Sequence, residues 1–175
     1  MLQIHQLNVN GQVVTFKSGA NSTVLQNIRS HLGLTATRYG CSQEQCGTCH
    51  VLIDGKSKPT CQLPVDALDG CSVVTLESAQ NHDLPSTPFL KVLQSAFIDE
   101  QAAQCGYCTS GLLISATALL MNAHETVSDQ QIREALEPHL CRCGTHVRVL
   151  RAVKKAALQC GLKVVRSEVS AWASP

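Results

Sequence analysis

The strongest constraint on this chain is a short run that holds three cysteines within nine residues. Four residues separate Cys41 from Cys46, two separate Cys46 from Cys49, and Cys61 follows after eleven more. This C-x4-C-x2-C…C spacing is the ligand pattern of a plant-type 2Fe–2S cluster. Four thiolates suffice for such a cluster, because sulfides fill the other positions on its two irons. The sequence therefore predicts a cluster-binding loop at residues 41–49.

Other uses of these cysteines must be weighed against a cluster. Structural zinc sites favour two C-x2–4-C knuckles, and disulfides need an oxidising compartment, so zinc ranks second and disulfides far behind. Gly40 and Gly47 are expected to let the backbone close around the inorganic core, where a Cβ would clash. Plant-type ferredoxins place their fourth cysteine much further along than Cys61, so this is not an ordinary ferredoxin of that type.

Length and composition exclude several classes of protein. The chain has 175 residues, enough for one domain or two small ones, and a net charge of +1 with no basic run, which gives no case for nucleic acid. No apolar stretch approaches the ~18 residues of a membrane span, and the N-terminus does not resemble a signal peptide. Ten cysteines without a leader indicate metal or redox chemistry in a reducing compartment, and we expect the cytoplasm.

The N-terminal part, residues 1–79, reads as a small sheet with one helix packed across it. Asn10-Gly11 predicts a two-residue hairpin turn between strands, and Ser22 or Thr23 can begin a helix. Residues 50–53 predict a strand that turns at Asp54-Gly55 and returns at residues 60–63, with a closing strand at 71–76.

The remainder of the chain has a helical pattern. Residues 80–86 are polar and contain a proline, as expected of a linker, and residues 87–161 predict four helices. Ser128, with Gln131 three residues later, predicts a capping box at the start of the third helix. Residues 162–175 are interpreted as a tail.

A second set of cysteines lies at the junctions between these helices. One pair stands between the first two helices and the other between the last two: Cys105, Cys108, Cys141 and Cys143. An antiparallel four-helix arrangement would bring the pairs together at one end, where four thiolates could hold a second 2Fe–2S cluster or, as the second choice, zinc. Cys71 and Cys160 remain, and both are expected to be buried structural thiols.

Together these motifs resemble the small iron–sulfur subunit of the molybdenum hydroxylases, the xanthine dehydrogenase and aldehyde oxidoreductase group. The resemblance rests on residues 39–55, 104–111 and 141–145, in that order and with those spacings, and it covers nearly the whole chain. Residues 97–104 look most like the bacterial enzymes that hydroxylate N-heteroaromatics or oxidise aldehydes.

The resemblance implies an α+β fold in which a ferredoxin-like β-grasp domain precedes a four-helix bundle, each with one 2Fe–2S cluster. It also implies a large partner subunit that carries molybdopterin. Electrons would pass from molybdenum through the helical-domain cluster to the other cluster, and then to a flavin subunit, a flavoprotein or a cytochrome c. The chain would be an oxidoreductase subunit without substrate-converting residues. Cys143 and Gln104 would lie beside the pterin, although Gln104 could instead cap a helix end.

This sequence departs from the usual family pattern in a few places. Ser42 and Glu44 stand where glycine or another small residue is common, Ser110 replaces a proline, and His146 replaces an aromatic residue. No departure removes a ligand. Two other functions compete with that of a hydroxylase subunit: a zinc-binding interaction module and a two-cluster ferredoxin that acts alone.

Overall fold

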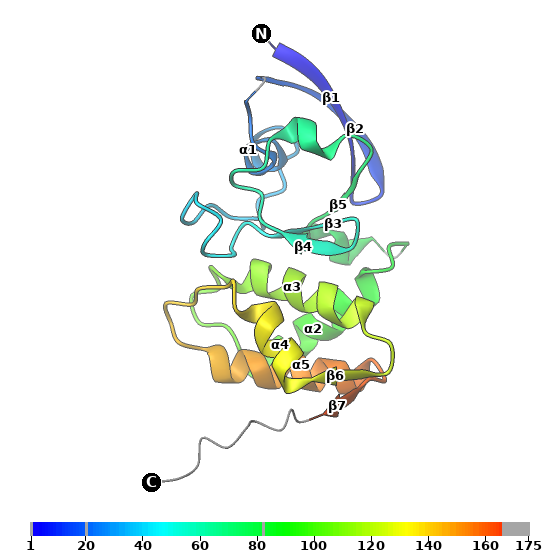
Figure 1. Ribbon diagram of the computed structural model, residues 1–175, viewed down its shortest axis with the longest axis vertical. Coiled ribbons are helices and arrows are strands. Elements are labelled where there is room, and N and C mark those ends of the chain that lie inside the picture. Colours follow the sequence, from blue (N-terminus) through cyan, green and yellow to red (C-terminus); the bar gives the residue numbers. More distant parts are fainter. Residues whose placement is uncertain (1, 20, 82, 166–175) are drawn as a thin grey trace.

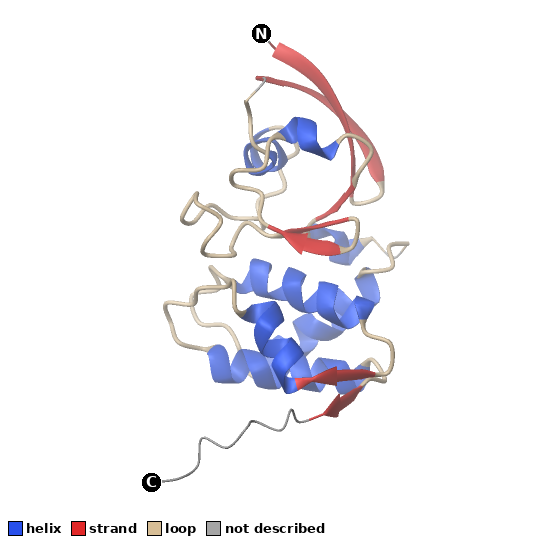
Figure 2. Ribbon diagram, in the orientation of Figure 1, coloured by secondary structure: helices blue, strands red, loops and turns tan. Residues whose placement is uncertain are grey.

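The two parts of the chain stack along the long axis of the molecule (Figure 1). The computed structural model describes residues 2–19, 21–81 and 83–165. The sheet with its short helices forms one end, and the longer helices form the other (Figure 2). The structure is therefore α+β, as the sequence predicts.

The N-terminal part is built on a five-stranded mixed sheet with the order β2-β1-β5-β3-β4. Its strands are β1 (Leu2–Val9), β2 (Gln12–Gly19), β3 (Val51–Ile53), β4 (Lys56–Lys58) and β5 (Ser72–Val74). β1 pairs with β2 in antiparallel register and with β5 in parallel register, while β3 is antiparallel to both β4 and β5. The parallel pair of β1, the first strand, and β5, the last strand of this part, lies inside the sheet and joins the two hairpins.

Both predicted hairpin turns have the expected backbone. Asn10 and Gly11 have φ values of 53° and 81°, and Asp54 and Gly55 have 49° and 77°, as type I′ turns require. The return strand after the second turn was expected at residues 60–63, and this was wrong. A two-residue turn places Lys56 directly opposite Ile53, so pairing begins at once and ends before Pro59.

Helix α1 (Val24–Ser30) packs across the sheet. Thr23 and Gln26 form a reciprocal capping box at its start. The 3-10 helix η2 (Leu76–Gln80) packs against helices of the C-terminal part, whereas α1 and the 3-10 helix η1 (Val65–Leu68) cover the sheet. The core beneath them consists of buried aliphatic and aromatic side chains: Leu7, Val9, Phe16, Val24, Ile28, Val51, Ile53, Val65, Leu68 and Val73.

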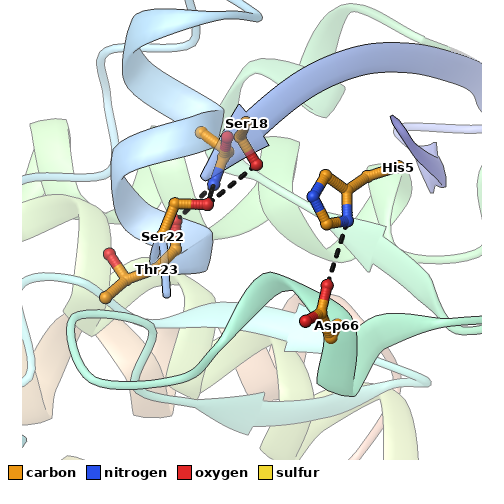
Figure 3. A network of polar contacts seen from close by, with 6 residues as sticks. His5, Ser18, Ser22, Thr23 and Asp66 are labelled. Atoms are coloured by element: carbon orange, nitrogen blue, oxygen red, sulfur yellow. Dashed lines mark hydrogen bonds and ion pairs between the residues drawn. The ribbon is translucent and has the colours of Figure 1, made fainter. Parts of the chain in front are cut away.

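Polar contacts tie the hairpin to its neighbours at one edge of this core (Figure 3). Nδ1 of the buried His5 in β1 lies 3.1 Å from a carboxylate oxygen of Asp66 in η1. The Ser22 hydroxyl donates to the hydroxyl of Ser18 at 2.8 Å, just before α1 begins. These contacts hold β1 and β2 against the segments that flank the first cysteine loop.

The described residues of the C-terminal part form four helices, α2 (Thr87–Asp99), α3 (Thr109–Asn122), α4 (Asp129–Leu136) and α5 (His146–Gln159). Ser128 and Gln131 form the predicted capping box of α4. Most of α3 is buried, because it lies between the sheet and the other helices (Figure 1). Among the described residues, no helix has the length and apolar character needed to span a bilayer.

A small parallel sheet joins the segment that follows α5 to the segment between α3 and α4. β6 (Thr126–Ser128) pairs with β7 (Lys163–Val165), a strand within the segment that the sequence suggests is a tail. Leu162 is buried in the helical core and Val164 packs against it, so these residues belong to the bundle. The rest of the expected tail, residues 166–175, lies outside the described residues.

Candidate metal centres

The first cysteine set lies at the tip of the loop that connects α1 to β3. Backbone N–H groups point at its sulfurs: those of Gln43 and Gln45 lie 3.3 and 3.2 Å from Cys41 Sγ. The N–H of Glu44 lies 3.4 Å from Cys61 Sγ, which brings the distant fourth cysteine to the same loop. The loop is thus folded around its sulfur atoms, as a cluster-binding loop must be.

Two further N–H groups complete this pattern. The N–H of Cys41 lies 3.3 Å from Cys46 Sγ, and that of Thr60 lies 3.4 Å from Cys49 Sγ. Each of the four sulfurs therefore has at least one backbone donor. Backbone donors favour the thiolate form that a metal requires, and hydrogen bonds to sulfur are one determinant of cluster potential.

The unusual residues of this loop occupy left-handed backbone positions. Ser42 and Glu44 have φ values of 53° and 59°, a region that favours glycine. This conformation explains why small residues suit these two positions, and both side chains here are exposed. It also aims the N–H groups of residues 43–45 inward, so the conformation serves the sulfur contacts.

The two glycines beside the first set have different roles. A Cβ on Gly40 would lie 2.5 Å from Cys46 Sγ, so this glycine leaves room for a candidate ligand. A Cβ on Gly47 would instead lie 2.2 Å from His139 Nδ1 and 2.7 Å from the carbonyl oxygen of Pro138. Gly47 therefore allows the helical domain to approach the loop, whereas the sequence suggested room for the inorganic core.

The helical bundle brings the second cysteine set together at one end. Cys108 is the N-cap residue of α3, and Cys141 and Cys143 lie between α4 and α5. The thiols of Cys105 and Cys143 are within hydrogen-bonding reach of each other, and so are those of Cys108 and Cys141. The four candidate ligands therefore lie in two contacting pairs.

Each set combines thiols that ionise easily with thiols that do not. Burial opposes ionisation of Cys41, but hydrogen bonds from the backbone of Gln43 and Gln45 outweigh it and lower its pKa to about 7. Burial raises the pKa of Cys61 to about 11 and, together with Cys141, that of Cys108 to about 12. A metal centre that binds all four thiolates would release the protons of the buried thiols on assembly.

Two cysteines of each set line one cavity of about 380 Å³. Its walls include residues of both domains: Gly40, Cys41, Gln45, Cys46, Thr48, Cys105, Tyr107, Cys108, Leu140 and Arg142. Within the described ranges, no three or more histidine, cysteine or acidic side chains converge closely enough for a single metal ion. A 2Fe–2S core differs from such a site, because it spreads its four protein thiolates over two irons.

Hydrogen bonds connect the two cysteine loops directly. The N–H of Leu140 donates to the carbonyl oxygen of Cys46 at 3.1 Å. Nη1 of Arg38 donates to the carbonyl oxygen of Gly106 at 2.8 Å, and the Tyr107 hydroxyl donates to the backbone carbonyl oxygen of Tyr39. These bonds cross between the domains, so they fix the position of one set relative to the other.

A buried polar network lies behind the cavity, and sequence reasoning missed it. Ser115 Oγ in α3 lies 2.6 Å from Ser57 Oγ and 2.6 Å from His139 Nε2, and Ser57 Oγ lies 2.8 Å from His50 Nδ1. Burial lowers the pKa of His50 to about 4 and, with His50 nearby, that of His139 to about 3. Both imidazoles are therefore neutral near pH 7. The sequence offered one signal for this network: His50 directly follows Cys49, and His139 lies two residues before Cys141.

Three residues considered in the sequence analysis lie outside the two sets of four cysteines: Gln104, Cys71 and Cys160. Gln104 is exposed in the loop before Cys105 and lies outside the caps of α2 and α3, which are Glu100 and Cys108. Cys71 and Cys160 are only partly buried, whereas the sequence suggested full burial. Cys71 contacts the Asp54 side chain, and that hydrogen bond raises its pKa.

Comparisons with known proteins agree with this geometry. Residues 7–72 match the family model for a 2Fe-2S iron-sulfur cluster binding domain, and residues 75–154 match that for a [2Fe-2S] binding domain. The chain is 44% identical over 151 residues to a nicotinate dehydrogenase subunit of Pseudomonas putida, covering 86% of this chain and 92% of that protein. It is 39% identical to the alpha chain of isoquinoline 1-oxidoreductase of Brevundimonas diminuta, covering 85% and 94%.

A solved structure shows the same arrangement. The fold matches a chain of quinoline 2-oxidoreductase from Pseudomonas putida 86 with a TM-score of 0.78 and 30% identity, over 91% of this chain and 96% of that one. Fold and site together define a two-domain protein with two 2Fe–2S-binding domains. The chain belongs to the small iron–sulfur subunits of the molybdenum hydroxylase family and is part of an oxidoreductase.

Proposed function

We propose that this chain carries electrons, one at a time, to an external acceptor from a molybdopterin centre on a large partner subunit. Two 2Fe–2S clusters would supply the redox chemistry. Cys41, Cys46, Cys49 and Cys61 would hold one cluster, and Cys105, Cys108, Cys141 and Cys143 the other. The observation that carries this proposal is the cavity that Cys41 and Cys46 share with Cys105 and Cys108, with hydrogen bonds between their loops.

The surface of the helical domain supports the proposal that this domain lies next to the pterin of the large subunit. A groove of about 710 Å³ lies beside the Cys105 loop, and its lining includes Phe97, Ile98, Leu113 and Arg148. Ile98 is 76% exposed there, an arrangement suited to a protein partner. We place the large subunit on this groove, with the exposed amide of Gln104 and the sulfur of Cys143 toward the pterin. An amide can both donate to and accept from a pterin edge.

The other end of the electron path would be the first cysteine loop. Residues 42–45 are exposed, so an acceptor can come close to Cys41 without any rearrangement of the sheet. A flavin subunit, a flavoprotein or a cytochrome c could each dock there. The names of the relatives favour an N-heteroaromatic substrate over an aldehyde, and the substrate pocket would lie on the large subunit.

The test is metal analysis and spectroscopy of the untagged protein from its native host. We expect four irons and four acid-labile sulfides per chain, visible absorption, two distinct EPR signals and a much larger co-purifying chain. In the complex, addition of the substrate should reduce both clusters. Zinc in place of iron would support an interaction module, and two clusters without a large chain would support a ferredoxin that acts alone. Either result would defeat the proposal.

A further inference from the structure

The first residue before α5 departs from the usual behaviour of a threonine at that position. Thr23 and Ser128 accept hydrogen bonds from the N–H groups of Gln26 and Gln131, at 3.3 and 3.1 Å, and so cap their helices. Thr145 is the N-cap residue of α5 but makes no such bond. Its ψ is 8°, against 157° and 156° at Thr23 and Ser128, so its hydroxyl is free for another partner.

That partner is a candidate cluster ligand. The Thr145 hydroxyl oxygen lies 3.3 Å from Cys141 Sγ, and the Thr145 side chain is 4% exposed. A thiolate bound to iron has no proton, so the hydroxyl must be the donor in the assembled centre.

We propose that Thr145 raises the reduction potential of the helical-domain cluster by donating its hydroxyl hydrogen bond to the Cys141 thiolate. This inference rests on the proposed function, which gives Cys141 its iron. One-electron reduction adds negative charge to the cluster and its thiolates, and a donor to sulfur stabilises the reduced state more than the oxidised one. The buried position of Thr145 strengthens the effect, because water cannot replace the lost donor there.

Among the described residues, no side-chain hydroxyl contacts a sulfur of the sheet-domain centre as its sole partner. Its sulfurs are contacted mainly by backbone N–H groups, which substitution leaves in place. Thr48 is the nearest counterpart, but its hydroxyl is shared between Cys46 Sγ at 3.4 Å and the carbonyl oxygen of Arg38 at 3.3 Å. Thr145 therefore gives a means of shifting the potential of one cluster alone and of changing the driving force between the two.

The experiment is an EPR-monitored redox titration of the complete complex carrying Thr145→Val, which keeps the shape and removes the hydroxyl. We expect the equilibrium constant for one-electron reduction of the helical-domain cluster to fall about three- to tenfold, where tenfold is ~59 mV. The sheet-domain cluster should keep its potential. Thr145→Ser, which retains the hydroxyl, should restore the wild-type value.

Thr117→Val is the matched control. The Thr117 hydroxyl is buried in the same domain but donates to the carbonyl oxygen of Leu113 at 2.8 Å, and no contact with a sulfur is seen in the part of the chain that the structure describes. If Thr145→Val fails to load iron, Thr145→Ala carries the same expectation. An unchanged potential in a variant with four irons overturns the inference but leaves the proposed function intact. An equal shift in Thr145→Ser and Thr145→Val also overturns it, because the methyl group or packing would then be responsible.

Discussion

Gly111 in α3 approaches Gly47 so closely that a Cβ on Gly111 would lie 2.2 Å from the Gly47 carbonyl oxygen. The same Cβ would lie 3.0 Å from His139 Nδ1. A helix of one domain thus rests directly on the backbone of the loop that holds the first cysteine set. The distance between the two centres depends on this contact, because neither glycine can gain a side chain without moving a loop.

The first prediction concerns this contact. Alanine within a helix is normally favoured over glycine by ~1 kcal/mol, yet we expect Gly111→Ala to be destabilising. The clash involves backbone atoms that cannot rotate away, and overpacking of this kind costs roughly 1–3 kcal/mol. Urea unfolding of the cluster-loaded protein measures the effect. Gly19→Ala is the control, because no atom of the described residues outside its chain neighbours lies within 4 Å of the added Cβ. Equal stability of the two variants would contradict the contact.

The second prediction is the pH dependence of stability. The pKa values of His50 and His139 in the folded chain, about 4 and about 3, lie below the ordinary 6.5. The unfolded chain therefore binds more protons as pH falls below 6.5, so the free energy of unfolding decreases from there to about pH 4. Each histidine contributes up to ~1.4 kcal/mol per pH unit within this window.

Urea titrations at several pH values test this dependence. His139→Gln should flatten the slope between pH 6.5 and 4, because one of the two titrating groups is gone. His124→Gln should leave it unchanged, since His124 is exposed. A His139→Gln variant that keeps the full wild-type slope would remove the buried network as its cause.

The third prediction separates the two cysteine sets. Cys46→Ser should eliminate or strongly perturb one EPR signal and Cys108→Ser the other, because the sets lie in different domains. Cys71→Ser and Cys160→Ser are the matched controls and should leave both signals intact. Loss of a cluster in Cys71→Ser would show that the ligand assignment is wrong.

Features of this fold that are encoded locally could be predicted from the sequence. Asn10-Gly11 favours a hairpin turn through the backbone preferences of these two residues, and Ser128 with Gln131 forms a capping box within four consecutive positions. The spacing of Cys41, Cys46 and Cys49 likewise constrains a single loop. Such signals need only neighbouring residues, so a sequence displays them directly.

Features that depend on distant pairing could not be predicted in this way. β7 forms because Lys163–Val165 pair with Thr126–Ser128, and nothing within residues 163–165 indicates that partner. The role of Gly47 was misread for the same reason, since Pro138 and His139 approach it from another domain. The contact of Thr145 with Cys141 could not be predicted either, because it depends on the backbone conformation of one turn.

The fourth prediction tests the proposed docking groove. Ile98→Lys should weaken binding to the large subunit by at least tenfold, because burying an isoleucine side chain contributes ~1.5–3 kcal/mol and ~1.4 kcal/mol corresponds to tenfold. Iron content should stay at four per chain. Ile4→Lys is the control, since Ile4 is 69% exposed on β1 in the other domain. Co-purification and the dissociation constant of the complex are the measurements, and equal binding by both variants would rule out the groove.

The last prediction concerns the entry of electrons into this chain. Gln104 is exposed beside Cys105, and no hydrogen bond of its side chain is seen among the described residues, so its amide is available to a pterin edge. Gln104→Ala leaves every thiol in place, and both clusters should assemble with unchanged EPR signals. Reduction of the clusters by substrate should slow about tenfold, the effect of losing ~1.4 kcal/mol of transition-state stabilisation. Reduction by dithionite, which bypasses the pterin, should keep its rate.

Gln159→Ala is the control, because Gln159 is equally exposed at the far end of α5. Stopped-flow absorbance in the complex measures both rates, and wild-type substrate kinetics in Gln104→Ala would exclude this residue from the path.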